Sequence, residues 1–293
     1  MKTLTPLVIV IAFIAAPFAL HTASPLPAIA ATTAQPQPVF TLKQISPSAV
    51  HHALTGFPRL RFWESTSGNW SGYAVPLDTT GTRDTFSAVQ GTWTIPLVTG
   101  LLTPTYSSAW VGIDGYTSDS VEQIGTEQDW TGKSVSNYVW FEMYPNYAYE
   151  ITGFPAKPGD SISAKVVYEG QSNVRVGRRT EVESVFQLTI TNNTEKASYT
   201  VPSSYTSSTA SFARSSAEWI LEAPASSSIL PLADYGATSF SSCEATSVHS
   251  GGKPAPISSW VPDPLTMIDP NGGDSTPSAL SANGQAFSVD YSD

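Results

Sequence analysis

Cysteine and histidine are nearly absent from this chain of 293 residues, which holds one cysteine and four histidines. The single thiol, Cys243, cannot form an internal disulfide, and it excludes cysteine-based zinc sites. His249 is the one imidazole after residue 64. A Ser-His-Asp triad would therefore have one candidate base, and no Gly-x-Ser-x-Gly motif accompanies it. We predict a solvated His249, a buried and idle Cys243, no metal and no cofactor.

Charged residues are also scarce, at 13% of the chain against about 25% in a typical soluble domain. The net charge of −10 argues against nucleic-acid binding, which needs a basic surface. Hydrophobic residues make up 41%, enough for a sizeable core. The charge is uneven: residues 1–64 hold four basic side chains and one acidic, whereas residues 65–293 hold 10 basic and 23 acidic.

The first 64 residues differ in composition from the rest. A lysine at position 2, an apolar run over residues 7–20 and small residues at 28–30 are typical of a secretory signal peptide, which we place at residues 1–31. Pro17 and the shortness of the run argue against a membrane anchor. Residues 32–64 are rich in proline, alanine and threonine and are predicted to be a propeptide or linker. We therefore expect a secreted protein that has no membrane contact after cleavage.

The remaining residues, 65–293, show a hydrophobic period of two. Apolar and polar residues alternate over residues 162–168, 186–190 and 287–291, which is typical of half-buried strands. Turn sequences at 157–160, 192–193 and 269–273 separate such stretches. No segment of this part has a helical period of 3.6. The pattern predicts a single all-β domain, a sandwich or a barrel.

Three otherwise core-like segments, 121–125, 140–145 and 217–222, carry carboxyl or amide groups. Strand alternation places Glu142 on one face with Trp140, and Glu218 on one face with Glu222. A carboxylate among apolar neighbours is costly to desolvate unless it is paired or used. Each segment alone is explained by an edge strand whose polar face meets water. Three together favour a cleft.

These segments resemble the glutamic peptidases (eqolisins). Six matching stretches occur in family order: Asn-Trp-Ser-Gly at 69–72, Ala-Trp-Val-Gly-Ile-Asp-Gly at 109–115, Gln-Ile-Gly at 123–125 followed by Asp-Trp at 129–130, Trp-Phe-Glu-Met-Tyr-Pro at 140–145, Pro-Gly-Asp-Ser-Ile at 158–162, and Ala-Glu-Trp-Ile-Leu-Glu at 217–222. Two departures stand out. Fungal members carry cysteines where Ser118 and Ala213 stand, and residues 125–129 are expected to form a longer loop.

The resemblance implies an acid endopeptidase on a β-sandwich of two antiparallel sheets, jelly-roll or concanavalin-like, acting on polypeptides. It assigns the catalytic pair to Gln123 and Glu222. The residues that it assigns to the substrate-binding cleft are Trp70, Trp110, Asp114, Trp140 and Glu142. We expect a monomer.

A glutamate and a glutamine can supply the chemistry of peptide hydrolysis. The carboxylate acts as general base on water and then as acid toward the leaving amine, while the amide N–H stabilises the oxyanion. A carboxyl stays partly ionised in acid, where a histidine base would be protonated. Two alternatives remain open at this point: a jelly-roll glycoside hydrolase using Glu142 and Glu222, and a secreted carbohydrate-binding module.

Overall fold

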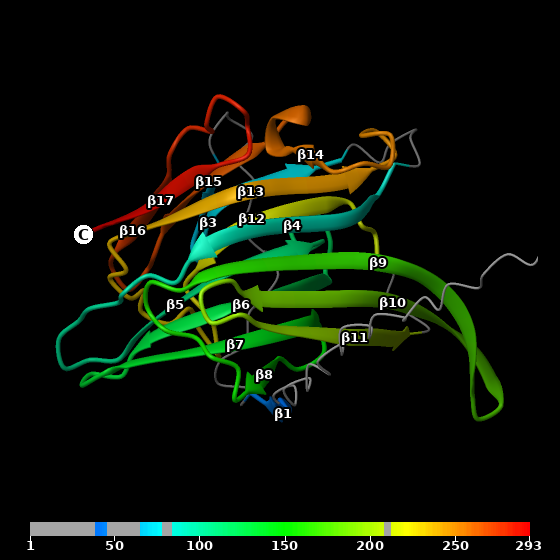
Figure 1. Ribbon diagram of the computed structural model, residues 1–293, viewed down its shortest axis with the longest axis horizontal. Coiled ribbons are helices and arrows are strands. Elements are labelled where there is room, and N and C mark those ends of the chain that lie inside the picture. Colours follow the sequence, from blue (N-terminus) through cyan, green and yellow to red (C-terminus); the bar gives the residue numbers. More distant parts are fainter. Residues whose placement is uncertain (1–38, 46–64, 78–83, 208–211) are drawn as a thin grey trace, which may run out of the picture. The chain divides into compact units, whose positions relative to one another are not determined.

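The computed structural model describes residues 39–45, 65–77, 84–207 and 212–293 (Figure 1). The predicted signal peptide and most of the predicted propeptide lie outside these described residues. Within them the chain forms strands, turns and one three-residue 3-10 helix, η1 (Ile257–Ser259). The all-β prediction is confirmed. No helix in the described part of the chain is long and apolar enough to cross a bilayer.

The first sheet is antiparallel apart from one short strand at its edge. Its neighbours pair in the order β1 (Thr41–Gln44), β8 (Tyr149–Thr152), β7 (Val135–Tyr144), β6 (Val121–Trp130), β5 (Thr105–Ile113), β12 (Ser216–Glu222), β3 (Trp70–Pro76) and β15 (Asp263–Ile268). Strand β2 (Ser65–Ser67) pairs with β15 in parallel.

The second sheet is antiparallel throughout. Its order is β11 (Ala197–Ser207), β10 (Arg179–Asn192), β9 (Ser161–Val176), β4 (Phe86–Thr94), β13 (Ala237–Ser247), β17 (Phe287–Ser292) and β16 (Asp274–Pro277). The two-residue strand β14 (Ala255–Pro256) pairs with β13. Strand β16 also pairs with β15, so the two sheets are joined along one edge.

The main hydrophobic core contains side chains from both sheets. It combines Val111, Ile124 and Trp219 of the first sheet with Val166 and Phe186 of the second. Figure 1 shows β4, β9 and β10 lying over strands of the first sheet. The alternating pattern is confirmed where the sequence predicted it, because the apolar positions of β9, β10 and β17 are the inward-facing ones. Cys243 is free and buried, and His249 is exposed in a turn, as predicted.

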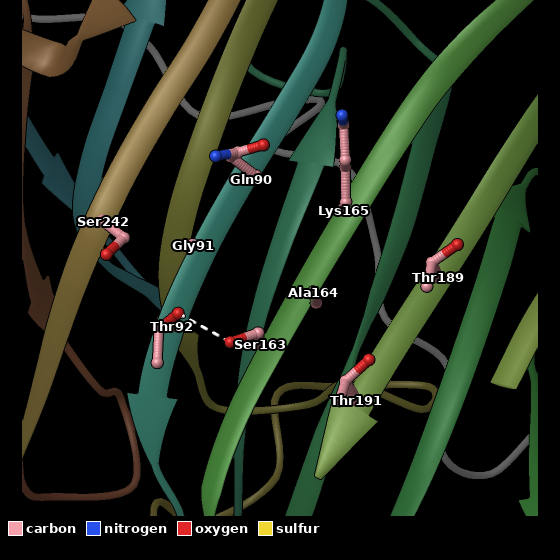
Figure 2. Close-up of a pocket in the computed structure, with 9 residues that line it drawn as sticks. All are labelled: Gln90, Gly91, Thr92, Ser163, Ala164, Lys165, Thr189, Thr191 and Ser242. Atoms are coloured by element: carbon pink, nitrogen blue, oxygen red, sulfur yellow. Dashed lines mark hydrogen bonds between the residues drawn. The ribbon is translucent and has the colours of Figure 1, made fainter. Parts of the chain in front are cut away.

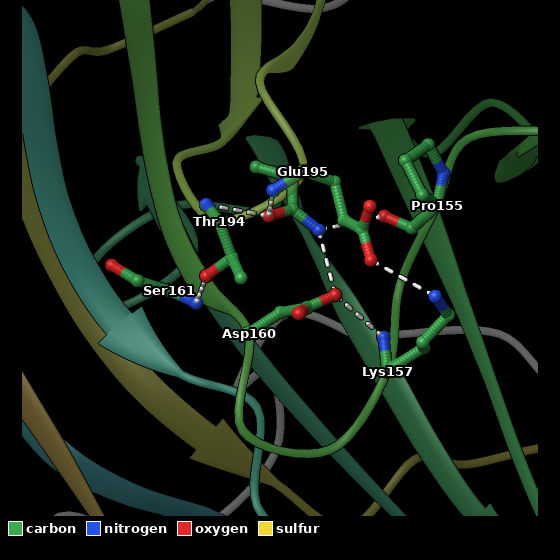
Figure 3. A network of polar contacts seen from close by, with 7 residues as sticks. Pro155, Lys157, Asp160, Ser161, Thr194 and Glu195 are labelled. Atoms are coloured by element: carbon green, nitrogen blue, oxygen red, sulfur yellow. Dashed lines mark hydrogen bonds and ion pairs between the residues drawn. The ribbon is translucent and has the colours of Figure 1, made fainter.

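A buried aspartate fixes the turn that precedes β9 (Figure 3). The Asp160 carboxylate accepts hydrogen bonds from the Lys157 backbone N–H at 3.0 Å and from the Asn192 side-chain amide at 2.8 Å. It thereby connects the start of β9 to the end of β10. Asn192 begins an Asn-x-Thr sequon, but its amide is buried and engaged in this network. The folded chain therefore does not offer it for glycosylation.

Strand β1 is an element that the sequence did not predict. Residues 39–45, expected to be propeptide or linker, belong to the same compact unit as the rest of the chain up to residue 293. β1 extends the first sheet beyond β8, and the Ile45 backbone N–H donates to the Ala148 carbonyl at 2.9 Å. The alternation of a four-residue exposed strand is too short to be recognised in sequence.

Candidate active site

One face of the first sheet carries polar groups among large aromatics, and we call it the site face. The strand register places Glu222 on β12 beside Trp70 of β3 and Ser108 of β5. It places Gln123 on β6 beside Glu142 of β7. The opposite face of these strands points into the main core. The two residues predicted to be catalytic therefore share one face, on strands separated by β5.

None of the three polar segments is an edge strand. β6 lies between β5 and β7, β7 between β6 and β8, and β12 between β5 and β3. The explanation by a polar strand edge in water is therefore wrong. Glu142, Gln123 and Glu222 have no exposed surface, so each needs polar partners within the protein.

Two donors hold the carboxylate of Glu222. The Trp110 indole N–H donates to Oε2 at 2.8 Å, and the Asn69 side-chain amide donates to Oε1 at 3.2 Å. Asn69 is itself held by Ser67, whose hydroxyl accepts from its backbone N–H at 3.2 Å. These hydrogen bonds, which reach both oxygens, fix the orientation of the carboxyl group.

Gln123 and Glu142 form the other half of the site. The Gln123 amide donates from Nε2 to Glu142 Oε2 at 2.8 Å. Gln123 Oε1 and Glu142 Oε1 are buried and have no hydrogen-bond partner in the structure. Burial, and then the nearby charge of Glu222, raise the pKa of Glu142 well above its ordinary value, against the smaller effect of the Gln123 hydrogen bond. Glu142 is therefore a neutral acid in acidic medium.

Trp110 lies between these two halves, and neighbouring glycines make room for it. A Cβ at Gly125 would lie 2.5 Å from the Trp110 Cβ, and one at Gly112 would lie 2.9 Å from the indole ring. Both contacts are too close for any side chain. Trp70 packs edge-on against Trp110, with ring centroids 4.9 Å apart. These aromatics belong to a second apolar cluster with Trp140 and Ile220.

The match with known proteins follows this geometry. Residues 68–289, more than half of the chain, match the Peptidase A4 family. The chain belongs to the Peptidase A4 family. It is a glutamic peptidase, and therefore a hydrolase. The alternatives of a glycoside hydrolase and of a carbohydrate-binding module are wrong.

Similar proteins agree with this assignment. Aspergillopepsin-2 of Aspergillus niger is 28% identical over 251 residues, which cover 78% of this chain and 79% of that protein. The structure resembles that of scytalido-glutamic peptidase with a transition-state analogue inhibitor, with a TM-score of 0.58 and 25% identity over 77% of this chain and 99% of that one. It also resembles aspergilloglutamic peptidase from Aspergillus niger, with a TM-score of 0.50 and 28% identity over 64% of this chain and 99% of that one.

Six of the seven residues predicted for the site lie together on the site face. They are Gln123 and Glu222, their hydrogen-bond partners Glu142 and Trp110, and Trp70 and Trp140 of the adjoining aromatic cluster. Trp140 lies in the same cluster, and its indole N–H donates to the Ser108 hydroxyl at 3.0 Å. Asp114 is different. It follows β5 with a φ of 71°, and its carboxylate accepts from the backbone N–H groups of Arg214 at 2.7 Å and Ser215 at 2.9 Å.

Asp114 thus ties the loop after β5 to the segment that precedes β12. The Thr117 and Ser215 hydroxyls are also hydrogen-bonded to each other, and the Gly115 backbone N–H donates to Ser118. This polar connection joins the loop of Ser118 to the segment after Ala213 without a disulfide. The geometry supports a structural role for Asp114 rather than contact with substrate.

Three further residues of the site face, Asn69, Ser108 and Glu127, were not predicted from the sequence. Asn69 stood in a matching motif, but no role was assigned to it. The residue also begins an Asn-x-Ser sequon, and its burial beside Glu222 removes it as a glycosylation site. The expected loop at residues 125–129 is wrong, because these residues continue β6 and place Glu127 on the site face.

A separate hollow lies on the outer side of the second sheet (Figure 2). Its volume is about 240 Å³, and polar side chains of β4, β9 and β10, with Ser242 of β13, line it. It contains none of the residues predicted for the peptidase site. We therefore place no part of the reaction there.

The Trp110→Phe variant tests the carboxylate arrangement. Loss of one hydrogen bond to a charged group costs about 1.5–3 kcal/mol, so we expect kcat/KM for a peptide to fall about 10- to 100-fold. Trp219→Phe is the matched control, because the Trp219 indole N–H donates to the Gln90 carbonyl on the core side. The control should keep the kcat/KM of its folded fraction. Equal losses in both variants would contradict the assignment.

Proposed function

We propose that this peptidase is a secreted acid endopeptidase in which Glu222 activates a water molecule and Gln123 stabilises the oxyanion. The observation that carries the proposal is the separate hydrogen-bonding of the two side chains on one face. Trp110 and Asn69 hold the carboxylate of Glu222, whereas Glu142 holds the amide of Gln123. Each reacting group is therefore oriented before substrate binds.

The reaction steps follow from the protons and hydrogen bonds that the side chains of Glu222 and Gln123 can give and accept. Ionised Glu222 takes a proton from water while the water oxygen attacks the peptide carbonyl carbon. The amide of Gln123 has two N–H groups, and the one not directed at Glu142 is available to donate to the carbonyl oxygen as it becomes negative. The unpartnered Gln123 Oε1 can accept a hydrogen bond from the attacking water. Protonated Glu222 then returns the proton to the leaving nitrogen, and the peptide C–N bond breaks.

The two carboxyl groups of the site have different tasks because their surroundings differ. Glu222 has two donors that stabilise a negative charge, whereas Glu142 has one donor and an unsatisfied oxygen. A neutral Glu142 holds Gln123 without adding a second negative charge where the oxyanion forms. Ionisation of Glu142 at higher pH would add that charge, so the arrangement favours acidic medium.

Glu222→Gln and Gln123→Ala test the catalytic pair, with Glu218→Gln as control on the same strand and face. Loss of the base or of the oxyanion donor should lower kcat/KM by about 10²- to 10⁴-fold. Cleavage of denatured casein at about pH 4, followed by mass spectrometry, measures activity and reports whether internal bonds are cut. Folded Gln123→Ala or Glu222→Gln enzyme with undiminished cleavage would refute the pair. Release of terminal residues alone would refute endopeptidase action.

We also propose that residues 1–31 direct export and that residues 32–64 are a prosegment removed in acid. The support is the path of residues 39–45. Phe40 packs against Phe154 and Tyr199, with ring centroids 5.2 and 5.6 Å apart. Ile45 packs against the aromatic cluster of the site face. A substrate could not use the space that Ile45 occupies.

Among residues 39–45, charge contributes little to this contact. In the described residues the prosegment has one ion pair, between Lys43 Nζ and Glu150 Oε2 at 3.2 Å, and the lysine is largely exposed. Exposed ion pairs of this kind contribute little to stability. Strand pairing with β8 and burial of Phe40 and Ile45 are the stronger contacts.

Ile45→Asp tests the prosegment, with the exposed Leu42→Asp on the preceding strand β1 as control. A charge in the apolar contact of Ile45 should shorten the time to processing at about pH 4 severalfold, whereas Leu42→Asp should process like the unchanged chain. Gel electrophoresis and N-terminal sequencing of the exported protein follow both cuts. The proposal is wrong if the purified precursor keeps its full length for hours at about pH 3–4.

A further inference from the structure

Strand β1 covers one edge of the first sheet (Figure 1). Residues 41–44 pair with β8 in antiparallel register, and the Ile45 backbone N–H continues this pairing to the Ala148 carbonyl at 2.9 Å. The side chains of β1 itself are exposed. The segment is therefore held by its main chain and by the residues that flank the strand, as when an extended peptide adds a strand to a sheet edge.

Two flanking side chains anchor the strand. Phe40 packs against Phe154 and Tyr199, with ring centroids 5.2 and 5.6 Å apart. Gly153, with a φ of 88°, turns the chain after β8 and places Phe154 beside Phe40. Tyr199 belongs to β11, so this aromatic contact joins edge strands of the two sheets. At the other end of the segment, Ile45 packs against the aromatic cluster of the site face.

Loss of residues 39–45 would open this edge of the sheet. The outward N–H and C=O groups of β8 would lose their partners, and an unpaired strand edge is a template for another extended chain. Phe154 and Tyr199 would also lose the ring that covers them. The extended chains that a processed peptidase meets are its substrates, so we take a substrate to be the occupant of the open edge.

We propose that the edge of β8 is an exosite, a substrate-binding site outside the catalytic groups, which binds an extended segment of a polypeptide substrate in place of residues 39–45. The proposal rests on the removal of the prosegment proposed above. An aromatic side chain of the substrate takes the place of Phe40, and a branched aliphatic side chain five positions later takes the place of Ile45. The exosite thus selects two side chains and an extended backbone.

The exosite is near enough to the proposed catalytic groups for one substrate to occupy both. Strands β8 and β7 separate an added strand from β6, which carries Gln123. Three strand spacings amount to about 14 Å, a distance that about five extended residues span. The end of the segment that contacts the site-face cluster is its C-terminal residue, Ile45. The bond that is cut therefore lies C-terminal to the segment in the exosite.

The test compares two synthetic substrates of acid-processed full-length enzyme. Both contain the same cleavable sequence, and the long substrate also carries the sequence of residues 39–45 at its N-terminus, joined by about six glycine and serine residues. The long substrate should have a KM about tenfold lower and the same kcat, because the exosite adds binding without a contact to the reacting bond. Equal KM values would overturn the proposal.

N-methylated forms of the long substrate test strand addition. The Ile45 N–H points to β8, and the alternation of antiparallel pairing directs the Lys43 N–H the same way and the Leu42 N–H away from β8. A methyl group on the nitrogen at the position of Lys43 should therefore remove the KM advantage. The same group at the position of Leu42 should preserve it. Equal KM values for the two methylated substrates would contradict pairing with β8.

Tyr199→Ala tests the aromatic contact on the enzyme, with Tyr291→Ala as matched control. Both tyrosines are half-buried, and each packs edge-on against another ring. Tyr291 lies on β17, which pairs with β13 and β16. Tyr199→Ala should raise the KM of the long substrate severalfold without affecting the short one, whereas Tyr291→Ala should change neither. An equal rise in KM for both substrates would place the effect in the catalytic site and refute the exosite.

Mass spectrometry of the processed enzyme separates this proposal from the proposed function. Loss of residues 39–45 together with equal KM values refutes the exosite alone. If the segment stays bound after acid treatment, the proposed prosegment is wrong, and the exosite with it, because the edge is still covered. Light scattering gives the last check. A dimer that forms on processing and persists with the long substrate would mean that a second copy occupies the edge, which would also overturn the proposal.

Discussion

A carboxyl group inside a protein must either be neutral or have donors that replace water, and the first sheet of this peptidase is built around that constraint. Burial raises the pKa of Glu122, Glu127, Glu142 and Glu218 well above the ordinary value. Glu222 instead receives one hydrogen bond on each oxygen. The sheet therefore contains one carboxyl group whose two oxygens accept hydrogen bonds from Trp110 and Asn69, and several whose burial favours the protonated form. In acidic medium the buried carboxyl groups with raised pKa values keep their protons.

The same constraint explains the tryptophans and glycines of the site face. A tryptophan supplies both a large apolar surface and one N–H donor. Trp110 uses its donor on Glu222, and Trp140 uses its donor on Ser108. The Trp110 ring fits because Gly112 of the same strand and Gly125 of β6 lie at the points of closest approach. Aromatic packing and carboxylate chemistry are therefore two parts of one arrangement.

The local sequence predicted the strands well and the candidate site only in part. The alternation of β9, β10 and β17 follows from burial of one face and could be predicted residue by residue. The central position of β12 could not, because its neighbours β3 and β5 come from far earlier in the chain. For that reason the sequence alone could not exclude that residues 217–222 form an edge strand.

The hydrogen bond from Asn69 to Glu222 could not be predicted for the same reason, the distance along the chain. Asn69 and Glu222 are 153 positions apart, so nothing in the surroundings of either residue indicates their hydrogen bond. Glu127 was missed because residues 125–129 were expected to form a loop, and only as part of β6 do they reach the site face. The role suggested for Asp114 by resemblance differs from its structural contacts, since backbone N–H groups of the neighbouring loop take up its carboxylate.

The most direct test of protonated buried carboxyls is the free energy of unfolding as a function of pH, measured by urea denaturation of the Glu222→Gln protein, which would not digest itself. A carboxyl whose pKa is higher in the folded state holds a proton that the unfolded chain releases, so its stabilising effect is complete below about pH 4.5 and is lost as the pH rises. The account predicts a fall of at least about 1.4 kcal/mol per pH unit between about pH 5 and pH 7, the slope for one such proton. A free energy of unfolding that is constant or rises over this range would contradict it.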